Sequence, residues 1–176
     1  LKGENGAGKT SLLRILVGLS SPASGYVSIN SHSVSDEINL ASSKLVYVGH
    51  KLGMSSILNP IENLRFWCEL QGVNVSVDAI NDVLLDLGLA GLEDLPVKHL
   101  SAGQQRRVAL AKLWLHKDAN LWVLDEPFTA LDVNLVEQLE SHISQFLDRQ
   151  GAVIMTSHQA LSLQTRARVF ELEYAW

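Results

Sequence analysis

The first ten residues place the strongest constraint on what this chain can fold into. Residues 3–10 read GENGAGKT, which matches the spacing G-x-x-x-x-G-K-[ST] at every fixed position, and an apolar helical pattern follows at once. In such a phosphate-binding loop (P-loop), backbone N–H groups surround the phosphates, the lysine meets the β- and γ-phosphates, and the Thr hydroxyl binds Mg²⁺. The motif therefore predicts an α/β fold in which a helix begins at a nucleotide phosphate.

A second feature is an apolar run that ends in two acids. Residues 121–124 carry no charged group, and Asp125 and Glu126 follow directly. Such a run is typical of a central parallel strand that is buried on both faces. Because ligands of open α/β sheets bind at the carboxyl ends of the strands, we expect both carboxylates near the bound nucleotide.

The third feature is Ser101-Ala102-Gly103-Gln104 at the start of an amphipathic stretch. Ser101 followed by Gln104 forms a capping-box pattern, which predicts a helix start whose free N–H groups suit an anion. Gly103 has no Cβ and lets a phosphate approach the backbone. By itself this pattern more often marks an ordinary capped helix. The three motifs in this order together predict ATP binding and hydrolysis.

These motifs resemble those of ABC-transporter ATPase domains over nearly the whole chain. Residues 3–10 resemble the Walker A motif, and residues 121–126 resemble the Walker B motif. Residues 100–104 resemble the ABC signature, with Ala102 where the family usually has glycine. Residues 130–132 resemble the D-loop, and residues 156–158 resemble the switch-histidine loop.

Five segments narrow the resemblance to the CcmA family, the ATP-binding subunits of haem-export or cytochrome c maturation systems. They are residues 47–50, 62–66 and 157–159 and the runs LSAGQQRRVALAKLWL and LDEPFTALD. Most ABC ATPases carry glutamine at position 50, where this chain has His50. Because Mg²⁺ prefers oxygen to an imidazole nitrogen, we expect His50 to hold a water or sense the γ-phosphate rather than bind the metal.

The motif chemistry and the resemblance assign roles to individual residues. Thr10 and Asp125 are predicted to hold Mg²⁺, and Lys9 to contact the phosphates. Glu126 is predicted to polarise the attacking water as general base, and His158 to orient that water and the γ-phosphate. The residues predicted to contact ATP are Gly3, Glu4, Asn5, Gly6, Ala7, Gly8, Lys9, Thr10, Ser11, His50, Ser101, Ala102, Gly103, Gln104 and Asp132.

Together these features predict a P-loop NTPase core with a parallel central sheet, joined to a helical subdomain that carries the signature. We expect helices over 9–17, 60–70, 77–87 and 133–147, and strands over 26–29, 44–48, 121–124, 152–155 and 169–174. Within one ABC ATPase domain spanning 1–176, residues 1–50 and 116–176 are assigned to the core and 51–115 to the helical subdomain. A P-loop needs a strand before it, and two residues are too few for one, so we expect N-terminal strands to be missing from this chain.

Two features allow a functional and a structural interpretation. Phe66 or Trp67 could grip a membrane partner, but plain packing in the core is an equally good explanation. Arg106 and Arg107 follow the signature, and we interpret them as a solvated helix face without a site.

Composition and spacing exclude several classes of protein. A net charge of −5 over 176 residues gives no basic footprint for nucleic acid. A DNA-repair ABC ATPase would need a long coiled-coil insertion between the P-loop and the signature, and a translation factor would need a second set of motifs. For the full-length protein, though not for this truncated chain, a binding module without turnover is disfavoured by the intact Lys9, Asp125, Glu126 and His158.

One chain holds two phosphate-binding helix starts, although one nucleotide needs only one. The family resemblance implies that two copies pair head-to-tail as an ATP-dependent homodimer, each signature closing the other's ATP. It also implies an integral membrane permease (CcmB-like, with CcmC-, CcmD- and CcmE-like proteins) and a peripheral location at the cytoplasmic face of the bacterial inner membrane. The alternative is the ATPase subunit of another ABC exporter or importer.

Overall fold

The computed structural model describes residues 1–29, 31–35, 44–157 and 166–173. Its contacts divide the chain into two compact units. The core unit comprises Leu1–His50, Ala119–Phe128 and Glu137–Trp176, and the helical unit comprises Lys51–Asp118 and Thr129–Val136. The long helix α7 (Val133–Asp148) begins in the helical unit and continues in the core unit.

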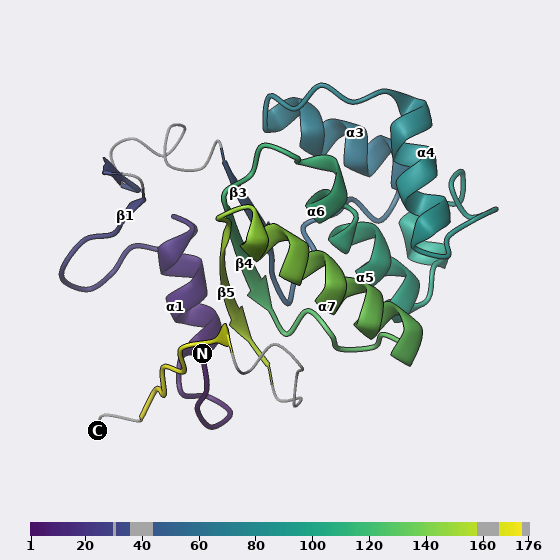
Figure 1. Ribbon diagram of the computed structural model, residues 1–176. Helices are drawn as coiled ribbons and strands as arrows, with labels where there is room; N and C mark the ends of the chain where they lie inside the picture. Colours follow the sequence, from purple (N-terminus) through teal and green to yellow (C-terminus); the bar gives the residue numbers. More distant parts are fainter. Residues whose placement is uncertain (30, 36–43, 158–165, 174–176) are drawn as a thin grey trace. The chain divides into compact units, whose positions relative to one another are not determined.

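The core unit is built on a parallel sheet (Figure 1). Its described strands are β3 (Leu45–Val48), β4 (Leu121–Asp125) and β5 (Ala152–Thr156), with β4 between the other two. Leu45 pairs with Leu121, and Asp125 pairs with Thr156. Two short strands, β1 (Ser28–Ile29) and β2 (His32–Ser33), form a separate antiparallel pair. The predicted strand at 26–29 is therefore shorter than expected.

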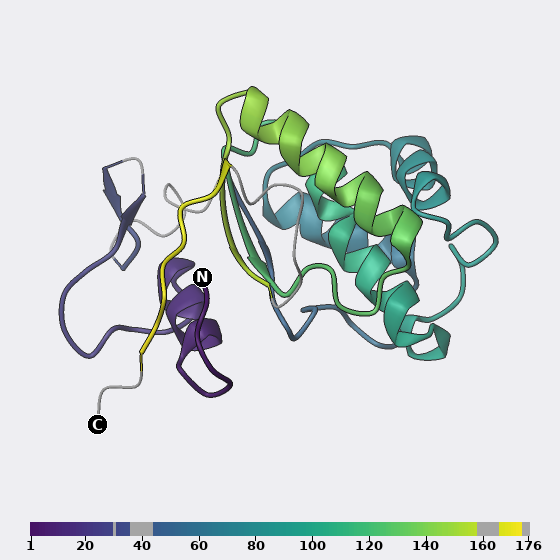
Figure 2. The ribbon, with the colours of Figure 1, turned by 60° about the horizontal axis from the view of Figure 1, so that its bottom comes forward.

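Strand β4 is buried on both faces because helices pack on each side of it (Figure 2). Val123 lies in an apolar cluster with Leu13 and Val17 of the segment around α1 (Lys9–Leu16), and Leu121 packs against that cluster. Trp122 points to the other face, where its ring stacks on Phe146 of α7 with centroids 3.7 Å apart. Since side chains alternate along a strand, residues 121, 123 and 125 share the α1 face. The sequence prediction of a central, doubly covered strand is confirmed.

The helical unit contains α3 (Pro60–Leu70), α4 (Val77–Asp86), the 3₁₀ turn η1 (Val97–His99), α5 (Ala102–Leu110) and α6 (Lys112–Leu115). Asn59 and Ser76 cap α3 and α4 by accepting hydrogen bonds from backbone N–H groups. The core of the unit consists of the buried residues Leu64, Cys68, Ile80, Leu84, Leu87, Leu89, Val97, Leu100, Val108, Ala111, Leu115 and Leu135. The helices predicted over 60–70 and 77–87 are confirmed to within one residue.

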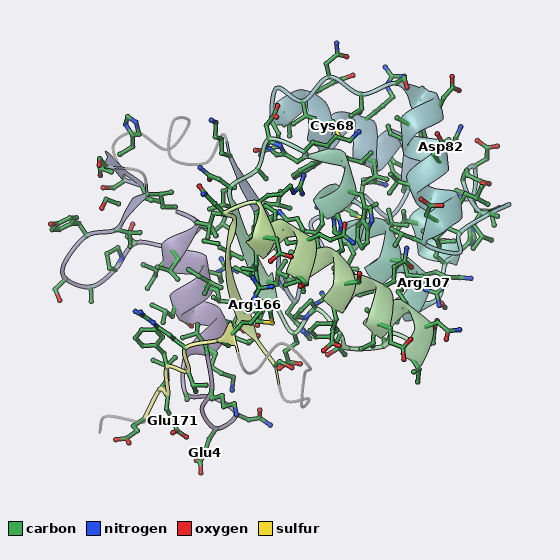
Figure 3. The ribbon with its side chains drawn as sticks, viewed as in Figure 1. Glu4, Cys68, Asp82, Arg107, Arg166 and Glu171 are labelled. Atoms are coloured by element: carbon green, nitrogen blue, oxygen red, sulfur yellow. The ribbon has the colours of Figure 1, made fainter. Side chains whose placement is uncertain are left out.

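Two sequence predictions are corrected by the structure. The strand predicted over 169–174 is wrong for the described residues 169–173, on which Figure 3 labels Glu171. Glu171 forms only an isolated bridge with Lys2. The two residues before the P-loop are too few to support a ladder. Arg106 is not on a solvated face, because only 6% of it is exposed in the interior of the helical unit.

Phe66 and Trp67, each predicted either to contact a membrane partner or to pack in the core, differ in exposure. Phe66 is 59% exposed, whereas Trp67 is partly buried against the core of the helical unit.

Among the described residues, no helix is both long and apolar enough to cross a membrane.

Lys112 is a charged side chain enclosed in this apolar unit, with only 5% of it exposed. Its Nζ donates to the Leu52 carbonyl at 3.4 Å and lies 5.6 Å from the centre of the Trp67 ring. Burial lowers the pKa of Lys112 to about 8, against an ordinary value of 10.5. Burial also raises the pKa of the neighbouring Cys68 thiol to about 11.

The shifted pKa of Lys112 predicts a pH-dependent stability. Between about pH 8 and 10.5 the unfolded chain holds a proton that the native Lys112 has lost, so this group raises the free energy of unfolding as pH rises. We therefore expect Lys112→Met to be more stable than wild type at pH 7, with a difference that shrinks toward pH 10.5. Urea unfolding of both proteins from pH 7 to 10.5 measures it.

Comparison with Lys112→Met is needed because Cys68 acts in the opposite direction. Its raised pKa makes the unfolding free energy fall between about pH 9 and 11 in both proteins. Exposed Lys98 provides the control, because the unfolding free energy of Lys98→Met should have the same pH dependence as that of wild type. Parallel curves for Lys112→Met and wild type would show that Lys112 keeps its proton in the fold.

Candidate functional site

The loop before α1 has the backbone conformation that a phosphate cradle requires. Gly6 and Gly8 adopt positive φ angles of 89° and 88°, where a side chain would be strained. Gly8 is the N-cap of α1, and no side chain caps this helix start. The first N–H groups of a helix have no partner within the helix. This loop therefore combines uncapped N–H groups with the positive end of the helix dipole.

Lys9 lies folded back over the same loop. Its Nζ donates to the carbonyl oxygens of Gly3 at 2.7 Å and Glu4 at 2.9 Å, and only 9% of the residue is exposed. The ammonium is thus held among the residues predicted to surround the β- and γ-phosphates. It is positioned by backbone carbonyls, which leave its positive charge without a neutralising carboxylate in these contacts.

Thr10 and Asp125, both predicted to hold Mg²⁺, lie in direct contact. The Thr10 hydroxyl donates to Asp125 Oδ2 at 2.7 Å, across 115 positions of sequence. The contact follows from the alternation of β4, which places Asp125 on the face covered by α1. A hydroxyl and a carboxylate are hard oxygen ligands of the kind that Mg²⁺ uses beside phosphate oxygens, so these residues fit the metal.

Thr156 holds the other side of the same carboxylate, and sequence analysis did not identify it as a site residue. Its hydroxyl donates to Asp125 Oδ1 at 2.7 Å and accepts the Glu126 N–H at 2.8 Å, and the residue is fully buried. The only indication in the sequence was that Thr156 lies two residues before the predicted site residue His158. Its contact with Asp125 depends on the register of β5 against β4, which the sequence does not state.

Glu126 stands at a strained backbone position. Its φ angle is +49°, in the left-handed region that residues other than glycine rarely adopt. Such a conformation costs on the order of 1–3 kcal/mol and persists only where surrounding contacts impose it. The hydrogen bond from its N–H to Thr156 is one such contact.

The predicted capping box at the start of α5 is confirmed. Ser101 Oγ accepts the Gln104 N–H at 3.2 Å, and Gln104 Oε1 accepts the Ser101 N–H at 2.8 Å. Ser101 and Ala102 are exposed. A Cβ added to Gly103 would lie 2.8 Å from the Ala130 carbonyl oxygen. Glycine is therefore required here by the neighbouring turn, a reason that differs from the predicted approach of a phosphate.

Arg107 connects this helix to the turn at 130–132, although we predicted no role for it. Its Nη2 pairs with Asp132 Oδ2, and its Nη1 donates to the Leu87 carbonyl at 3.3 Å. Asp132 Oδ1 accepts the Leu135 N–H at 3.0 Å and thereby caps α7. Asp132 was predicted to contact ATP, and within the helical unit it joins α5 to the start of α7.

Two predicted histidines remain without a structural assignment. His50 is exposed directly after β3 and Gly49, and its proposed role at the γ-phosphate stays a prediction. His158 lies outside the described residues. Of the predicted residues in the core unit, the structure brings Lys9 onto the P-loop carbonyls and Thr10 onto Asp125. In the helical unit, Gly103 lies next to the Ala130 carbonyl, and Asp132 pairs with Arg107 of α5.

Comparison with known proteins shows which proteins this chain resembles. The family model described as "ABC transporter" matches residues 1–129. The cytochrome c biogenesis ATP-binding export protein CcmA of Pseudomonas fluorescens is 46% identical over 92% of this chain and 76% of its own length. The protein of that name from Escherichia coli is 46% identical over 93% of this chain and 76% of its own length.

Solved structures show the same fold at low sequence identity. The dimeric structure of a post-hydrolysis state of the ATP-binding cassette MJ0796, bound to ADP and Pi, superposes with a TM-score of 0.78. It is 22% identical, and the match covers 89% of this chain and 72% of that one.

The Arg107–Asp132 pair provides a test of the helical unit that needs no nucleotide. Because Arg107 bridges Asp132 and backbone carbonyls, we expect Arg107→Gln to lower the free energy of unfolding by about 1–2 kcal/mol. The matched control is Arg65, whose ion pair with Glu69 is largely exposed, and Arg65→Gln should change it by less than about 0.5 kcal/mol. Equal effects in urea unfolding would contradict a special role for Arg107.

Proposed function

This chain belongs to the ABC transporter family of ATP-binding domains, and from that premise we propose that it energises an exporter of cytochrome c biogenesis by hydrolysing ATP. The main structural support for ATP hydrolysis is the 2.7 Å hydrogen bond between Thr10 of the P-loop helix and Asp125 at the end of β4. It joins a P-loop residue predicted to hold Mg²⁺ to the carboxylate at the end of β4. The exporter part is supported by the 46% identity to the ATP-binding export proteins described above.

Positioning and charge stabilisation account for most of the catalysis of phosphoryl transfer. The N–H groups at the start of α1 and the Lys9 ammonium would bind the phosphates of ATP. Thr10 and Asp125 would hold Mg²⁺, which supplies neutralisation of phosphate charge when bound. Glu126, next to Asp125 at the carboxyl end of β4, would accept a proton from the attacking water.

The exposed start of α5 would contact the ATP of a second copy of the chain. Support comes from its exposed position, its capping box and the dimeric state of the similar MJ0796 structure. ATP would then lie at the interface of a head-to-tail homodimer, and hydrolysis would release the two copies. This opening and closing is a ligand-driven shift between two states that a membrane partner can follow.

The remaining predictions concern the assembly. We propose a peripheral position on the cytoplasmic face of the inner membrane, bound to a CcmB-like permease with CcmC-, CcmD- and CcmE-like proteins. Haem, or a haem-loaded chaperone to be released, is the cargo that the sequence resemblance implies. An exposed Phe66 on α3 of the helical unit is compatible with contact to a membrane partner.

ATPase turnover of the full-length protein tests the catalytic part. We expect Glu126→Gln to reduce kcat at least about a hundredfold, because it removes the general base while keeping size and hydrogen bonding. Size exclusion in ATP and Mg²⁺ should show this variant trapped as a dimer. Exposed Glu137 provides the control, and Glu137→Gln should turn over at the wild-type rate.

Two results would contradict the proposal. Normal turnover by Glu126→Gln would remove Glu126 from the mechanism. Failure of the wild-type protein to hydrolyse ATP, both alone and co-expressed with its membrane partner, would contradict the function itself.

A further inference from the structure

Thr156 reaches both acids of the site from the neighbouring strand. In the parallel pairing of β4 and β5, Thr156 lies directly across from Asp125. Residues in register on adjacent strands direct their side chains to the same face of the sheet. This register places the Thr156 hydroxyl 2.7 Å from Asp125 Oδ1, on the face where Thr10 contacts Oδ2.

The donors and acceptors fix the direction of these hydrogen bonds. A backbone N–H can only donate, so the Glu126 N–H occupies a lone pair of the Thr156 hydroxyl. The single hydroxyl proton is then directed to Asp125 Oδ1. Because Thr156 is fully buried, water does not compete for these contacts at its own surface. One hydroxyl therefore sets the orientation of the Asp125 carboxylate and the backbone turn at Glu126.

The two contacts of Asp125 are not equivalent. Thr10 is exposed and belongs to the P-loop helix, where a bound nucleotide and metal would compete for its hydroxyl. Thr156 is fully buried in the sheet, where no nucleotide or metal is expected to compete for its hydroxyl. Of these two contacts, we therefore expect the one from β5 to persist when the nucleotide binds.

We propose that Thr156 is a positioning residue for ATP hydrolysis, which holds the Asp125 carboxylate ready for the metal and fixes the left-handed turn that presents Glu126. The inference rests on the proposed function and adds a residue to that site. The hydroxyl is the acting group, and the γ-methyl is not. This distinction separates the proposal from a role in core packing alone.

Three substitutions in the full-length protein separate hydroxyl from methyl. Thr156→Val keeps the shape and removes the hydroxyl, Thr156→Ser keeps the hydroxyl and removes the methyl, and Thr156→Ala removes both. We expect Thr156→Val to lower kcat at least about tenfold, with the KM for ATP within about twofold of wild type, because Lys9 and the P-loop amides are intact. Thr156→Ser should stay within about twofold of wild type in both constants.

A binding measurement gives a second readout that does not need turnover. Affinity for a fluorescent ADP analogue is measured with EDTA and then over a Mg²⁺ titration. In Thr156→Val the Mg²⁺ concentration for half-maximal tightening should rise about fivefold, while the affinity in EDTA stays within twofold of wild type. If Thr156→Val does not fold, Thr156→Ala against Thr156→Ser makes the same comparison, since these differ only by the hydroxyl.

The outcomes distinguish this inference from the proposed function. Wild-type turnover with Thr156→Val unchanged in kcat and in its Mg²⁺ dependence would overturn the role of Thr156 alone. Equal losses in Thr156→Ser and Thr156→Val, or in Thr156→Ser and Thr156→Ala, would assign the effect to packing and overturn it as well. An inactive wild-type protein would overturn the proposed function, and the Mg²⁺ titration would still decide whether Thr156 orients Asp125.

Discussion

The alternation of side chains along β4 is the constraint on which the core unit depends. It directs Val123 into the cluster with Leu13 of α1 and directs Trp122 onto Phe146 of α7. The same alternation then places Asp125 on the α1 face, where Thr10 donates to it. A shift of one residue would exchange the two faces, burying the acid against the aromatic side. The same register of β4 therefore determines both its apolar packing and the position of the Asp125 carboxylate.

Of the four described residues other than glycine that have a positive φ angle, two lie just after this strand. Glu126 and Ala130 both adopt left-handed φ angles, +49° and +62°, although neither is glycine. In the core unit, Thr156 accepts the Glu126 N–H. In the helical unit, the Ala130 carbonyl lies so close to Gly103 that no Cβ fits between them. Left-handed non-glycine residues next to candidate site residues are typical of functional sites.

Local patterns predicted the elements, and long-range contacts decided the details of the site. The capping box at Ser101 and the doubly covered strand at 121–124 were predictable because helix caps and apolar runs depend on only a few consecutive residues. Thr156 and Arg107 were not, since each acts through a partner at least 25 positions away. Arg106 was misjudged for the same reason, because charge alone predicts solvent until the packing of the helix is known.

The two helix starts associated with phosphate chemistry differ in how their polar groups are satisfied. At α1 the N-cap is Gly8 in a left-handed conformation, and no side chain bonds to the helix N–H groups. At α5, Ser101 and Gln104 satisfy one another through both halves of a capping box. A ligand at α1 supplies acceptors where no side chain caps the helix, whereas a ligand at α5 joins a start that is already capped. Under the proposed function, this difference suits a nucleotide that stays on its own P-loop while the contact with a second copy forms and breaks.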